Sequence, residues 1–522
     1  MKNITLLSLV GLLMFQWSFA GAADSGHPAV TNPVIYADVP DVNVVRVGDT
    51  YYMVSTTMHL MPGAPVMSSK DLVNWKIISY VFDELKDSPQ YDLLDGNVYG
   101  KGQWASSLRY HKGVFYVLFA TNSPQRTYIF KTTDPAGKWE LVSRQDRAYH
   151  DCSLFFDDDE RVYLVYGAGS IRIREFNADL SGPKTGGVDQ ELINGPAMGH
   201  ESLLEGTHVF KHENKYYLYL IWWPRGGIRT QLCFRSGALT WTYESKVVLS
   251  DTLDRRGAGV AQGCIIDTPE GEWYGMLFQD RGAVGRVPVL MPCSWIDGWP
   301  MLGDAQGKVA KVMKSPLPLQ AATPLVVSDD FDKPDLGITW QWNHNPVHTH
   351  WSLTERKGYM RLKTSRVVEN IFQAPNMLSQ RTEGPKCSAA VKLDVSKMQA
   401  GDVAGLSVYC AEPGMLSVVM EGKAKFLVMS DRLVEKERIA LKGKTVILRV
   451  DCDFDKGRDK AAFYYSFDNK KWTKIGSDFQ MIYNLRHFMG NRLAIYNFAT
   501  QGTGGYVDVD FFEYTREKEA VR

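Results

Sequence analysis

The feature that most constrains this chain is a pattern that recurs five times between residues 41 and 280. Each copy has a short polar or glycine-containing turn, a pair of residues ending in an aromatic, and a run of β-formers, which is typical of a hairpin. The copies are RVGDTYYMVST (46–56), YHKGVFYVLFAT (110–121), DDDERVYLVYG (157–167), KHENKYYLYLIWW (211–223) and DTPEGEWYGMLFQD (267–280). A repeat of about fifty residues that holds several short strands is typical of propeller blades. Because a lone hairpin cannot bury both faces, the five copies predict a five-bladed β-propeller.

The repeat also aligns one residue of each blade with its counterparts. Each copy has an anchoring tyrosine, namely Tyr52, Tyr116, Tyr163, Tyr217 and Tyr274. Eleven or twelve positions before these tyrosines stand Asp41, Trp104, Asp151, Glu205 and Gln262. If the blades are equivalent, these five side chains lie on the innermost strands and converge on the propeller axis.

Three of the five aligned residues are carboxylic acids. Any one of them alone is more simply explained as a turn, cap or paired core residue, but the shared register favours a common site. Like charges in a partly dry funnel raise each other's pKa and cost stability, and catalysis gives a reason to keep them. Glycosidic cleavage needs a proton donor with a raised pKa and a second carboxylate that acts on water or on the anomeric carbon. A third carboxylate can orient and tune the donor.

Five long segments carry a resemblance to a known family. They are YADVPDVNVVRVGDTYYMVSTTMHLMPGAPVMSSKDLVNW, YGKGQWASSLRYHKGVFYVLF, HDCSLFFDDDERVYLVYG, EGTHVFKHENKYYLYL and AQGCIIDTPEGEWYGMLFQDRGAVGRVPVLMP. In this order they resemble glycoside hydrolase family 43, whose members are five-bladed propellers with β-xylosidase and α-L-arabinofuranosidase activities. The resemblance implies that Asp41 is the general base, that Asp151 tunes and orients the acid, and that Glu205 is the general acid. It also implies inversion, with the base and the acid about 6.5–9.5 Å apart so that a water fits between them.

The resemblance extends to residues that would bind substrate. Arg286, in VGRVP, is similar to the substrate-contacting arginine of the family, and Gln262 is the fifth axial residue. Trp104 and His59 are candidate walls of the sugar subsite, with an ordinary packing role as the alternative. Relatives usually carry a histidine where Ala261 stands, so an axial calcium ion is in doubt. No cofactor is required for this chemistry, the metal ligands are unknown, and a structural calcium ion is left open.

The C-terminal part predicts a second all-β domain. A proline-rich segment (314–325) is expected to be a linker between a propeller at 21–313 and a domain at 326–522. Strand-like segments crowd together beyond it, which favours an antiparallel β-sandwich, and this resembles the concanavalin A-like sandwich attached to these hydrolases. Four acids could meet in space and hold calcium, although ordinary turn and edge roles are favoured for them: Asp329, Asp330, Asp508 and Asp510.

Composition and the N-terminus narrow the setting. Lys plus Arg equals Asp plus Glu at 59 each, so no charged field indicates nucleic acid or an anionic membrane. Residues 1–20 are typical of a signal peptide, and no later apolar run is long enough to span a bilayer, so a periplasmic or secreted protein is expected. The seven cysteines are widely spaced, which indicates neither a disulfide scaffold nor a zinc site.

The sequence therefore predicts an inverting exo-glycoside hydrolase that releases terminal α-L-arabinofuranosyl or β-D-xylosyl residues from plant polysaccharides or oligosaccharides. Arabinofuranose is slightly favoured over xylose. Two alternatives stay open: a glycan-binding propeller without catalysis, and a retaining propeller hydrolase or transferase that acts on fructosyl units.

Overall fold

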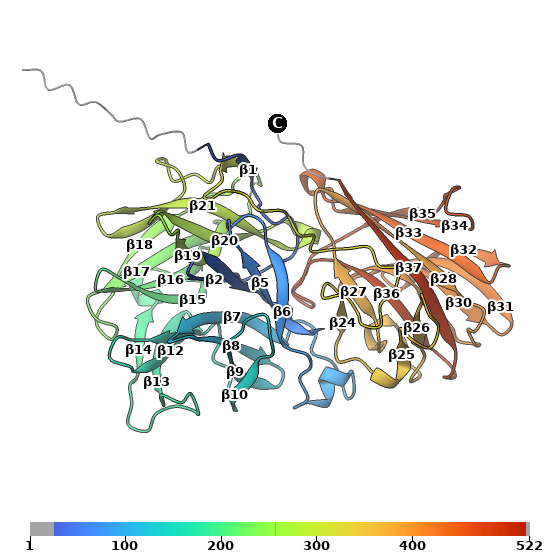
Figure 1. The fold of residues 1–522 in the computed structure, drawn as a ribbon, viewed down its shortest axis with the longest axis horizontal. Helices are drawn as coiled ribbons and strands as arrows, with labels where there is room; N and C mark the ends of the chain where they lie inside the picture. The colour runs from blue at the N-terminus through green and yellow to red at the C-terminus, as the bar shows by residue number, and fades with distance from the viewer. Residues whose placement is uncertain (1–25, 256, 518–522) are drawn as a thin grey trace, which may run out of the picture.

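The computed structural model describes residues 26–255 and 257–517, so the predicted signal peptide lies outside the described residues. The described chain is built from β-strands and six short 3-10 helices, and it forms two β-sheet lobes that lie side by side (Figure 1). None of the described helices has the length and apolar character that crossing a membrane requires. The 3-10 helices are η1 (Pro89–Asp92), η2 (Pro196–Met198), η3 (Gly282–Val284), η4 (His348–His350), η5 (Ile371–Gln373) and η6 (Asp455–Gly457).

The first lobe is a five-bladed propeller of four-stranded antiparallel sheets, as the repeat predicts. The anchoring tyrosines all lie on the second strand of their blades. The first blade has β2 (Asn43–Val47), β3 (Thr50–Val54), β5 (Gly63–Ser69) and β6 (Lys76–Phe82), and the second has β7 (Gln103–His111), β8 (Val114–Asn122), β9 (Gln125–Thr132) and β10 (Glu140–Gln145). The third has β11 (Ser153–Phe156), β12 (Val162–Ala168), β13 (Ser170–Phe176) and β14 (Asp189–Asn194). The fourth has β15 (Leu203–His212), β16 (Lys215–Trp223), β17 (Thr230–Ser236) and β18 (Glu244–Leu249), and the fifth has β19 (Val260–Asp267), β20 (Trp273–Asp280), β21 (Arg286–Ile296) and β22 (Trp299–Leu302).

The blades close into a ring around an axis. The first strands of neighbouring blades contact one another in the order β2, β7, β11, β15, β19, and β19 contacts β2. The ends of the propeller are tied together outside this ring, because β1 (Ala29–Thr31) pairs with β23 (Val312–Lys314). Asn32 strengthens the closure, since its side-chain amide donates to the carbonyls of Leu290 and Ala310. The five first strands are therefore the innermost ones.

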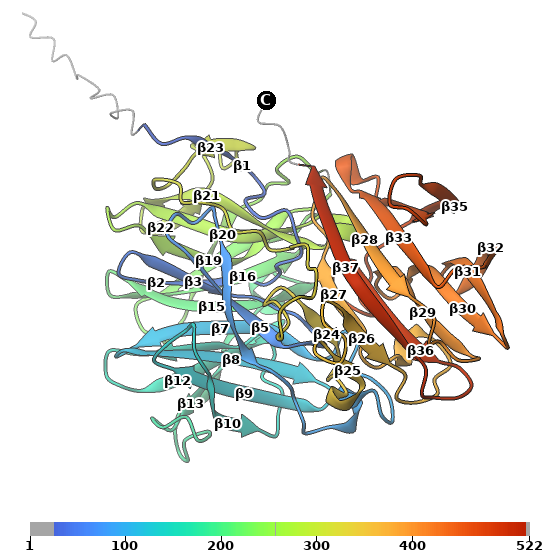
Figure 2. The same ribbon diagram turned by 45° about the vertical axis from the view of Figure 1, so that its right-hand side comes forward.

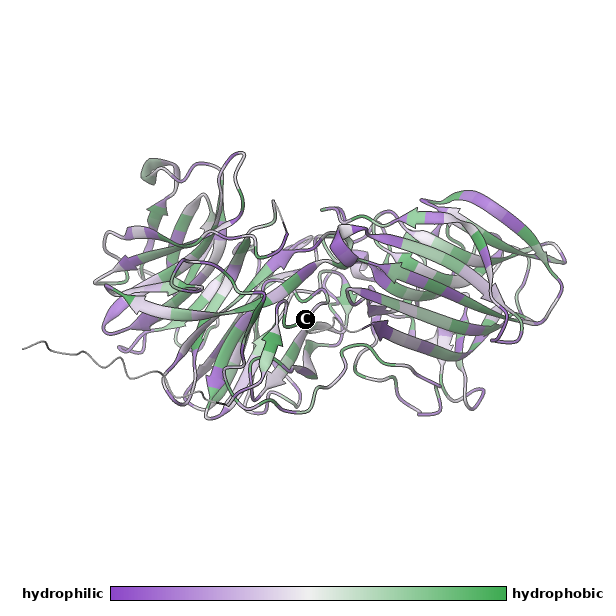
Figure 3. Ribbon diagram, turned by 90° about the horizontal axis from the view of Figure 1, so that it is seen from above, coloured by the Kyte–Doolittle hydropathy of each residue, from purple (hydrophilic) through white to green (hydrophobic). Residues whose placement is uncertain are grey.

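The second lobe is an antiparallel β-sandwich of two large sheets, as expected from the sequence. Side chains alternate between its interior and its surface: Cys387, Ala389, Val391 and Leu393 are buried, whereas the residues between them are mostly half-exposed. Figure 3 shows the corresponding alternation of hydrophobic and hydrophilic colours along the strands of both lobes. One sheet has the order β32 (Val434–Leu441), β31 (Ala424–Asp431), β30 (Gly414–Glu421), β29 (Asp402–Tyr409), β36 (Arg492–Ala499), β27 (Leu378–Arg381), β24 (Gln341–Asn343), β4 (Leu60–Met61). The other has the order β25 (Trp351–Ser352), β26 (Met360–Lys363), β37 (Tyr506–Glu517), β28 (Lys386–Asp394), β33 (Thr445–Asp453), β34 (Lys460–Ser466), β35 (Thr473–Gln480).

One strand departs from the division expected at residue 313. β4 lies between two strands of the first blade in the sequence, yet it pairs with β24 and extends a sheet of the sandwich. Figure 2 shows β24 and β27 of this sheet on the side of the sandwich that faces the propeller. The two lobes also share main-chain hydrogen bonds, such as the one from the N–H of Asn491 to the carbonyl of Ala283. A strand from the propeller segment therefore completes one sheet of the sandwich, and the loop between β35 and β36 of the sandwich packs against the propeller.

Candidate active site

The five aligned residues stand where the innermost strands begin, and the backbone there is irregular in every blade. Asp41, Asp151 and Gln262 have positive φ angles of 53°, 43° and 65°. The strand register shifts around Trp104 and directly after Glu205. Bulges and left-handed residues redirect side chains and are frequent beside active sites. The irregular start of each innermost strand thus turns the aligned side chains toward one end of the axis.

Asp41 is a buried carboxylate, and each of its two oxygens accepts a hydrogen bond. One oxygen, Oδ2, accepts a hydrogen bond of 2.7 Å from the hydroxyl of Thr56, and Oδ1 accepts one of 2.8 Å from Nη1 of Arg286. The side chains of Asp41 and Arg286 are only 6% and 3% exposed. A carboxylate oxygen can accept more than one hydrogen bond, so each oxygen keeps room for a proton from water. The ion pair fixes the orientation of this carboxylate.

Glu205 and Asp151 lie in adjacent blades and share a histidine neighbour. Oε2 of Glu205 lies 2.9 Å from Nε2 of His150, and Oδ2 of Asp151 lies 3.8 Å from the same nitrogen. Oδ2 of Asp151 also accepts a hydrogen bond of 3.0 Å from the N–H of Gly206, which anchors the residue after Glu205. The carboxyl of Asp151 therefore holds the backbone that carries Glu205.

The electrostatics of this cluster favour bound protons. Burial raises the pKa of Asp151 to about 7, with the charges of Glu205 and Asp41 adding to the rise and His150 opposing it. Burial acts to lower the pKa of His150, but the Asp151 and Glu205 carboxylates outweigh burial and raise this pKa to about 9. Since Asp41 acts on both groups, the three predicted acids belong to one electrostatic unit.

Aromatic rings from both lobes surround these groups. The ring of Trp104 lies edge-on to His150 at 5.3 Å and to Phe488 at 5.9 Å between centroids. Phe488 belongs to the sandwich, and its ring lies 4.4 Å from the guanidinium carbon of Arg286. A flat apolar face beside polar groups suits a sugar ring. Phe488, which no sequence motif marks, thus connects the predicted residues Trp104 and Arg286 at this site.

Gln262 also lies beside the acids. Its main-chain N–H donates to Oε1 of Gln231 at 2.8 Å, which fixes its left-handed backbone. Its side chain approaches Gly206 so closely that a Cβ atom there would lie 3.0 Å away. The structure therefore places Gln262 next to the segment that carries Glu205.

His59 is the one predicted site residue that the structure places elsewhere, and its expected role as a subsite wall is corrected. It is fully buried between the lobes, with ring centroids of Tyr99, His344 and His487 at 4.5, 5.0 and 5.5 Å. Burial lowers its pKa to about 3. A side chain without any exposed surface cannot contact a sugar, and the packing alternative holds because β4 carries the neighbouring chain into the sandwich.

Two residues of the site, His150 and Phe488, lie outside the sequence prediction. His150 directly precedes Asp151 in HDCSLFF, so its position beside an expected catalytic acid was a usable signal. Phe488 lies more than 200 residues beyond the other site residues in sequence, and only the packing of the lobes brings it to Arg286.

The innermost strands also share an arginine, Arg109, near the propeller axis. Arg109 is a half-buried side chain that donates to the carbonyls of Leu108, Leu154 and Val209 and to the hydroxyl of Ser153. These partners come from three innermost strands, and Asn43 adds a contact from a fourth blade at 3.3 Å. The guanidinium thus ties three innermost strands together near the axis.

The acids considered for a structural calcium ion do not gather into a site. Asp508 pairs with Arg361 and Arg356, Asp510 pairs with Lys392, and Asp329 accepts a hydrogen bond from the indole of Trp340. Among the described residues, the single group of His, Cys, Asp or Glu side chains close enough to share an ion is the His150 cluster. There, the hydrogen bond between His150 and Glu205 already uses the atoms concerned, so we assign no metal ligands. The seven cysteines are all buried and unpaired.

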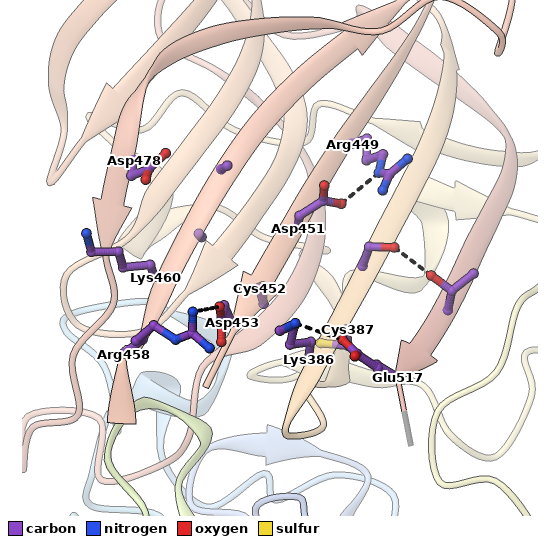
Figure 4. A pocket seen from close by; sticks show the side chains of 14 residues that line it. Lys386, Cys387, Arg449, Asp451, Cys452, Asp453, Arg458, Lys460, Asp478 and Glu517 are labelled. Atoms are coloured by element: carbon purple, nitrogen blue, oxygen red, sulfur yellow. Dashed lines mark hydrogen bonds and ion pairs between the residues drawn. The ribbon is translucent and has the colours of Figure 1, made fainter. Parts of the chain in front are cut away.

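A groove of about 590 Å³ on the outer face of the sandwich is chemically different from the axial site. Its charged side chains neutralise one another: Lys386 pairs with Glu517 at 3.0 Å, and Arg458 pairs with Asp453 at 3.3 Å (Figure 4). Arg449 pairs with Asp451 at 2.7 Å in the same way. The axial cluster, where two carboxyls lie beside one histidine, is the site suited to acid and base chemistry.

Comparisons with known proteins agree with the fold and the site. Residues 30–300 match the family model of glycosyl hydrolases family 43, and residues 328–515 match that of the β-xylosidase C-terminal concanavalin A-like domain. A β-xylosidase of Formosa agariphila is 30% identical over 94% of this chain and 91% of its own length. A non-reducing end α-L-arabinofuranosidase of Bacteroides ovatus is 30% identical over 78% of each chain. A solved bifunctional GH43-CE protein of Bacteroides eggerthii has a TM-score of 0.89 and 44% identity over 94% of this chain, which spans 64% of that protein's length.

Proposed function

Because the chain belongs to glycosyl hydrolases family 43 and is a glycoside hydrolase, we propose that it removes terminal α-L-arabinofuranosyl or β-D-xylosyl residues from plant oligosaccharides or polysaccharides with inversion. The observation that carries this proposal is the shared electrostatic unit of Asp41, Asp151 and Glu205 at one end of the propeller axis. One acid of this unit is held by an arginine, and another hydrogen-bonds a protonatable histidine.

Asp41 is the base in the proposed mechanism. It takes a proton from water while that water forms a bond to the anomeric carbon from the face opposite the leaving oxygen. Arg286 and Thr56 hold its carboxylate in place during this step. Glu205 gives a proton to the leaving oxygen as the glycosidic bond breaks. Asp151 keeps the Glu205 segment in position through Gly206. One proton is taken from water and one is given to the leaving group, so the reaction is balanced.

The surroundings of the acids support an exo mode of action. Trp104 and Phe488 pack edge-on against each other beside the acids, and Phe488 comes from the sandwich. Because the sandwich contributes one wall of the site, less space is left for a polysaccharide chain to run across the acids in both directions. The sandwich therefore favours a pocket for one terminal sugar over an open cleft.

The sugar at the cleaved end is one of two pentoses of similar shape, and we slightly favour arabinofuranose. Relatives of comparable identity are named for xylose in one case and for arabinofuranose in another. The test is a panel of p-nitrophenyl pentosides incubated with the purified protein, followed by NMR of the anomeric product. Turnover with inversion of one pentoside supports the proposal. Retention would contradict the inverting mechanism, and the absence of turnover on every aryl glycoside would favour a glycan-binding propeller without catalysis.

We also propose that the protein is exported to the periplasm or the cell exterior, since its first twenty residues have the composition of a signal peptide. Cell fractionation and N-terminal sequencing of the native protein test this. An intact N-terminus on cytoplasmic protein would contradict it.

A further inference from the structure

His150 has no role in the mechanism so far, yet it is the group closest to the proposed general acid. Its Nε2 atom lies 2.9 Å from Oε2 of Glu205 and 3.8 Å from Oδ2 of Asp151. His150 and Asp151 stand together before β11, whereas Glu205 lies on β15 of the next blade. The histidine therefore bridges two blades at the point where the leaving oxygen would receive its proton.

We propose that His150 supplies the proton that Glu205 delivers to the leaving oxygen, so that the imidazole reloads the general acid in every turnover. This inference rests on the proposed function, in which Glu205 is the acid and Asp41 is the base. His150 touches no reacting atom in this scheme, so it acts through Glu205 as a positioning and proton-supplying residue.

The proton balance closes over one cycle. After cleavage, Asp41 holds a proton taken from water, and Glu205 is a carboxylate. The imidazolium of His150 then transfers its Nε2 proton to Oε2 of Glu205, which gives a neutral imidazole and a carboxylic acid. His150 takes up a proton from solvent, and Asp41 releases one to solvent. No oxidant, reductant or further reactant is needed.

The position of His150 suits a route between solvent and the acid. Its side chain is 29% exposed, while that of Glu205 is 22% exposed and that of Asp151 is only 6% exposed. The edge of Trp104 lies against the imidazole, and the carbonyl of His150 accepts the N–H of Gly167 at 3.0 Å, so both the ring and its backbone are held. The charged groups that act on His150 are Asp151, Glu205 and Asp41.

Substrate binding itself favours the transfer. In the open site, water and the neighbouring carboxylates stabilise the charge-separated state, and the pKa of His150 is raised to about 9. When a sugar fills the site and excludes water, an ion pair loses more solvation than a neutral acid and a neutral imidazole do. The proton then shifts toward Glu205, and the acid becomes loaded when a glycosidic oxygen is present to receive the proton.

The test compares His150→Gln with wild type on two glycosides of the preferred pentose, one with a 2,4-dinitrophenyl leaving group and one with an alkyl leaving group. Since an alkyl leaving group needs acid assistance and a dinitrophenolate does not, we expect kcat to fall about 10²-fold on the alkyl glycoside and to change little on the aryl glycoside. We also expect the alkaline limb of the alkyl-glycoside pH profile to move to lower pH, and added imidazole to restore part of the rate.

Two further variants make the result interpretable. Glu205→Gln should show the same dependence on leaving group, with a larger loss on the alkyl glycoside. His212→Gln is the matched control, because His212 lies at the far end of β15, stacked on Trp295 and 3.9 Å from the carboxylate of Glu213, and should leave both rates unchanged. His150→Asn serves as a second variant if His150→Gln does not fold, as judged by its urea midpoint.

The outcomes separate this inference from the proposed function. Equal losses on both substrates with the wild-type pH profile would make His150 merely structural and overturn the inference. Wild-type rates on both substrates would overturn it as well. If Glu205→Gln showed no dependence on leaving group, the assignment of Glu205 as the acid would fail first, whatever His150→Gln did.

Discussion

The buried pair of Asp41 and Arg286 allows catalysis and stability to be separated by one double substitution. Removing one partner of a buried ion pair costs about 3–5 kcal/mol, because the other charge stays behind without compensation. In Asp41→Asn, Arg286 would lose its 2.8 Å partner while both side chains stay almost fully buried. Asp38 and Asp280 also act on this guanidinium, so we expect the lower end of this range, about 3 kcal/mol.

Activity should respond differently from stability. Loss of the general base should slow cleavage about 10²–10⁴-fold, which corresponds to about 2.7–5.4 kcal/mol of transition-state stabilisation. In the double variant Asp41→Asn/Arg286→Met, the unpaired guanidinium is gone, but the buried Asp38 loses one of its two neighbouring cations and keeps only Arg381. Part of the lost stability should therefore return while the activity stays lost. A buried pair replaced by neutral groups of similar volume is often no less stable than the original.

The assay pairs urea unfolding, followed by tryptophan fluorescence, with kcat/KM on the preferred pentoside. Midpoints are compared at constant slope, since a two-lobe protein need not unfold in two states. The reasoning is refuted if Asp41→Asn unfolds at the wild-type urea concentration, or if the double variant is less stable than the single one. Recovery of activity in the double variant would refute the role of Asp41 as the base.

Three other perturbations follow from the same contacts. Asp151 has a folded pKa of about 7 against 3.8 for a free aspartate, so its contribution to stability is present below about pH 4 and is lost as the pH rises through 7. Urea midpoints of the wild type measured from pH 4 to 8 should show this fall, and Asp151→Asn should flatten it. Arg109→Met should lower the urea midpoint of unfolding, because three buried carbonyls lose their donor at about 1–3 kcal/mol each. EDTA should leave wild-type activity unchanged, because the proposed mechanism uses side chains and water alone, and strong inhibition by EDTA would contradict that mechanism. A chain ending at residue 325 should lack activity, because it loses Phe488 and the Gly490 N–H that binds Asp38 at 2.9 Å; full activity on the aryl pentoside would show that the sandwich is dispensable.

The sequence by itself determined the propeller and predicted which acids meet near its axis. A repeat of turn, aromatic and β-formers is local information: each copy specifies its own hairpin, and five similar hairpins can bury their faces only against one another. The shared register then aligned Asp41, Asp151 and Glu205, because equivalent positions of equivalent blades face the same axis. The alternation of apolar residues likewise sufficed for the sandwich, since strands such as β28 have one buried face.

Only the tertiary structure decided how the two lobes complete the site. His59 belongs to a propeller segment in sequence, but β4 pairs with the sandwich and buries this imidazole away from the acids. Phe488 reaches Arg286 across about two hundred residues of chain, and Arg109 fills the axis through carbonyls of three different blades. Contacts of this kind depend on which surfaces meet after folding. A local pattern along the chain carries no information about the residue that will pack against it from another lobe.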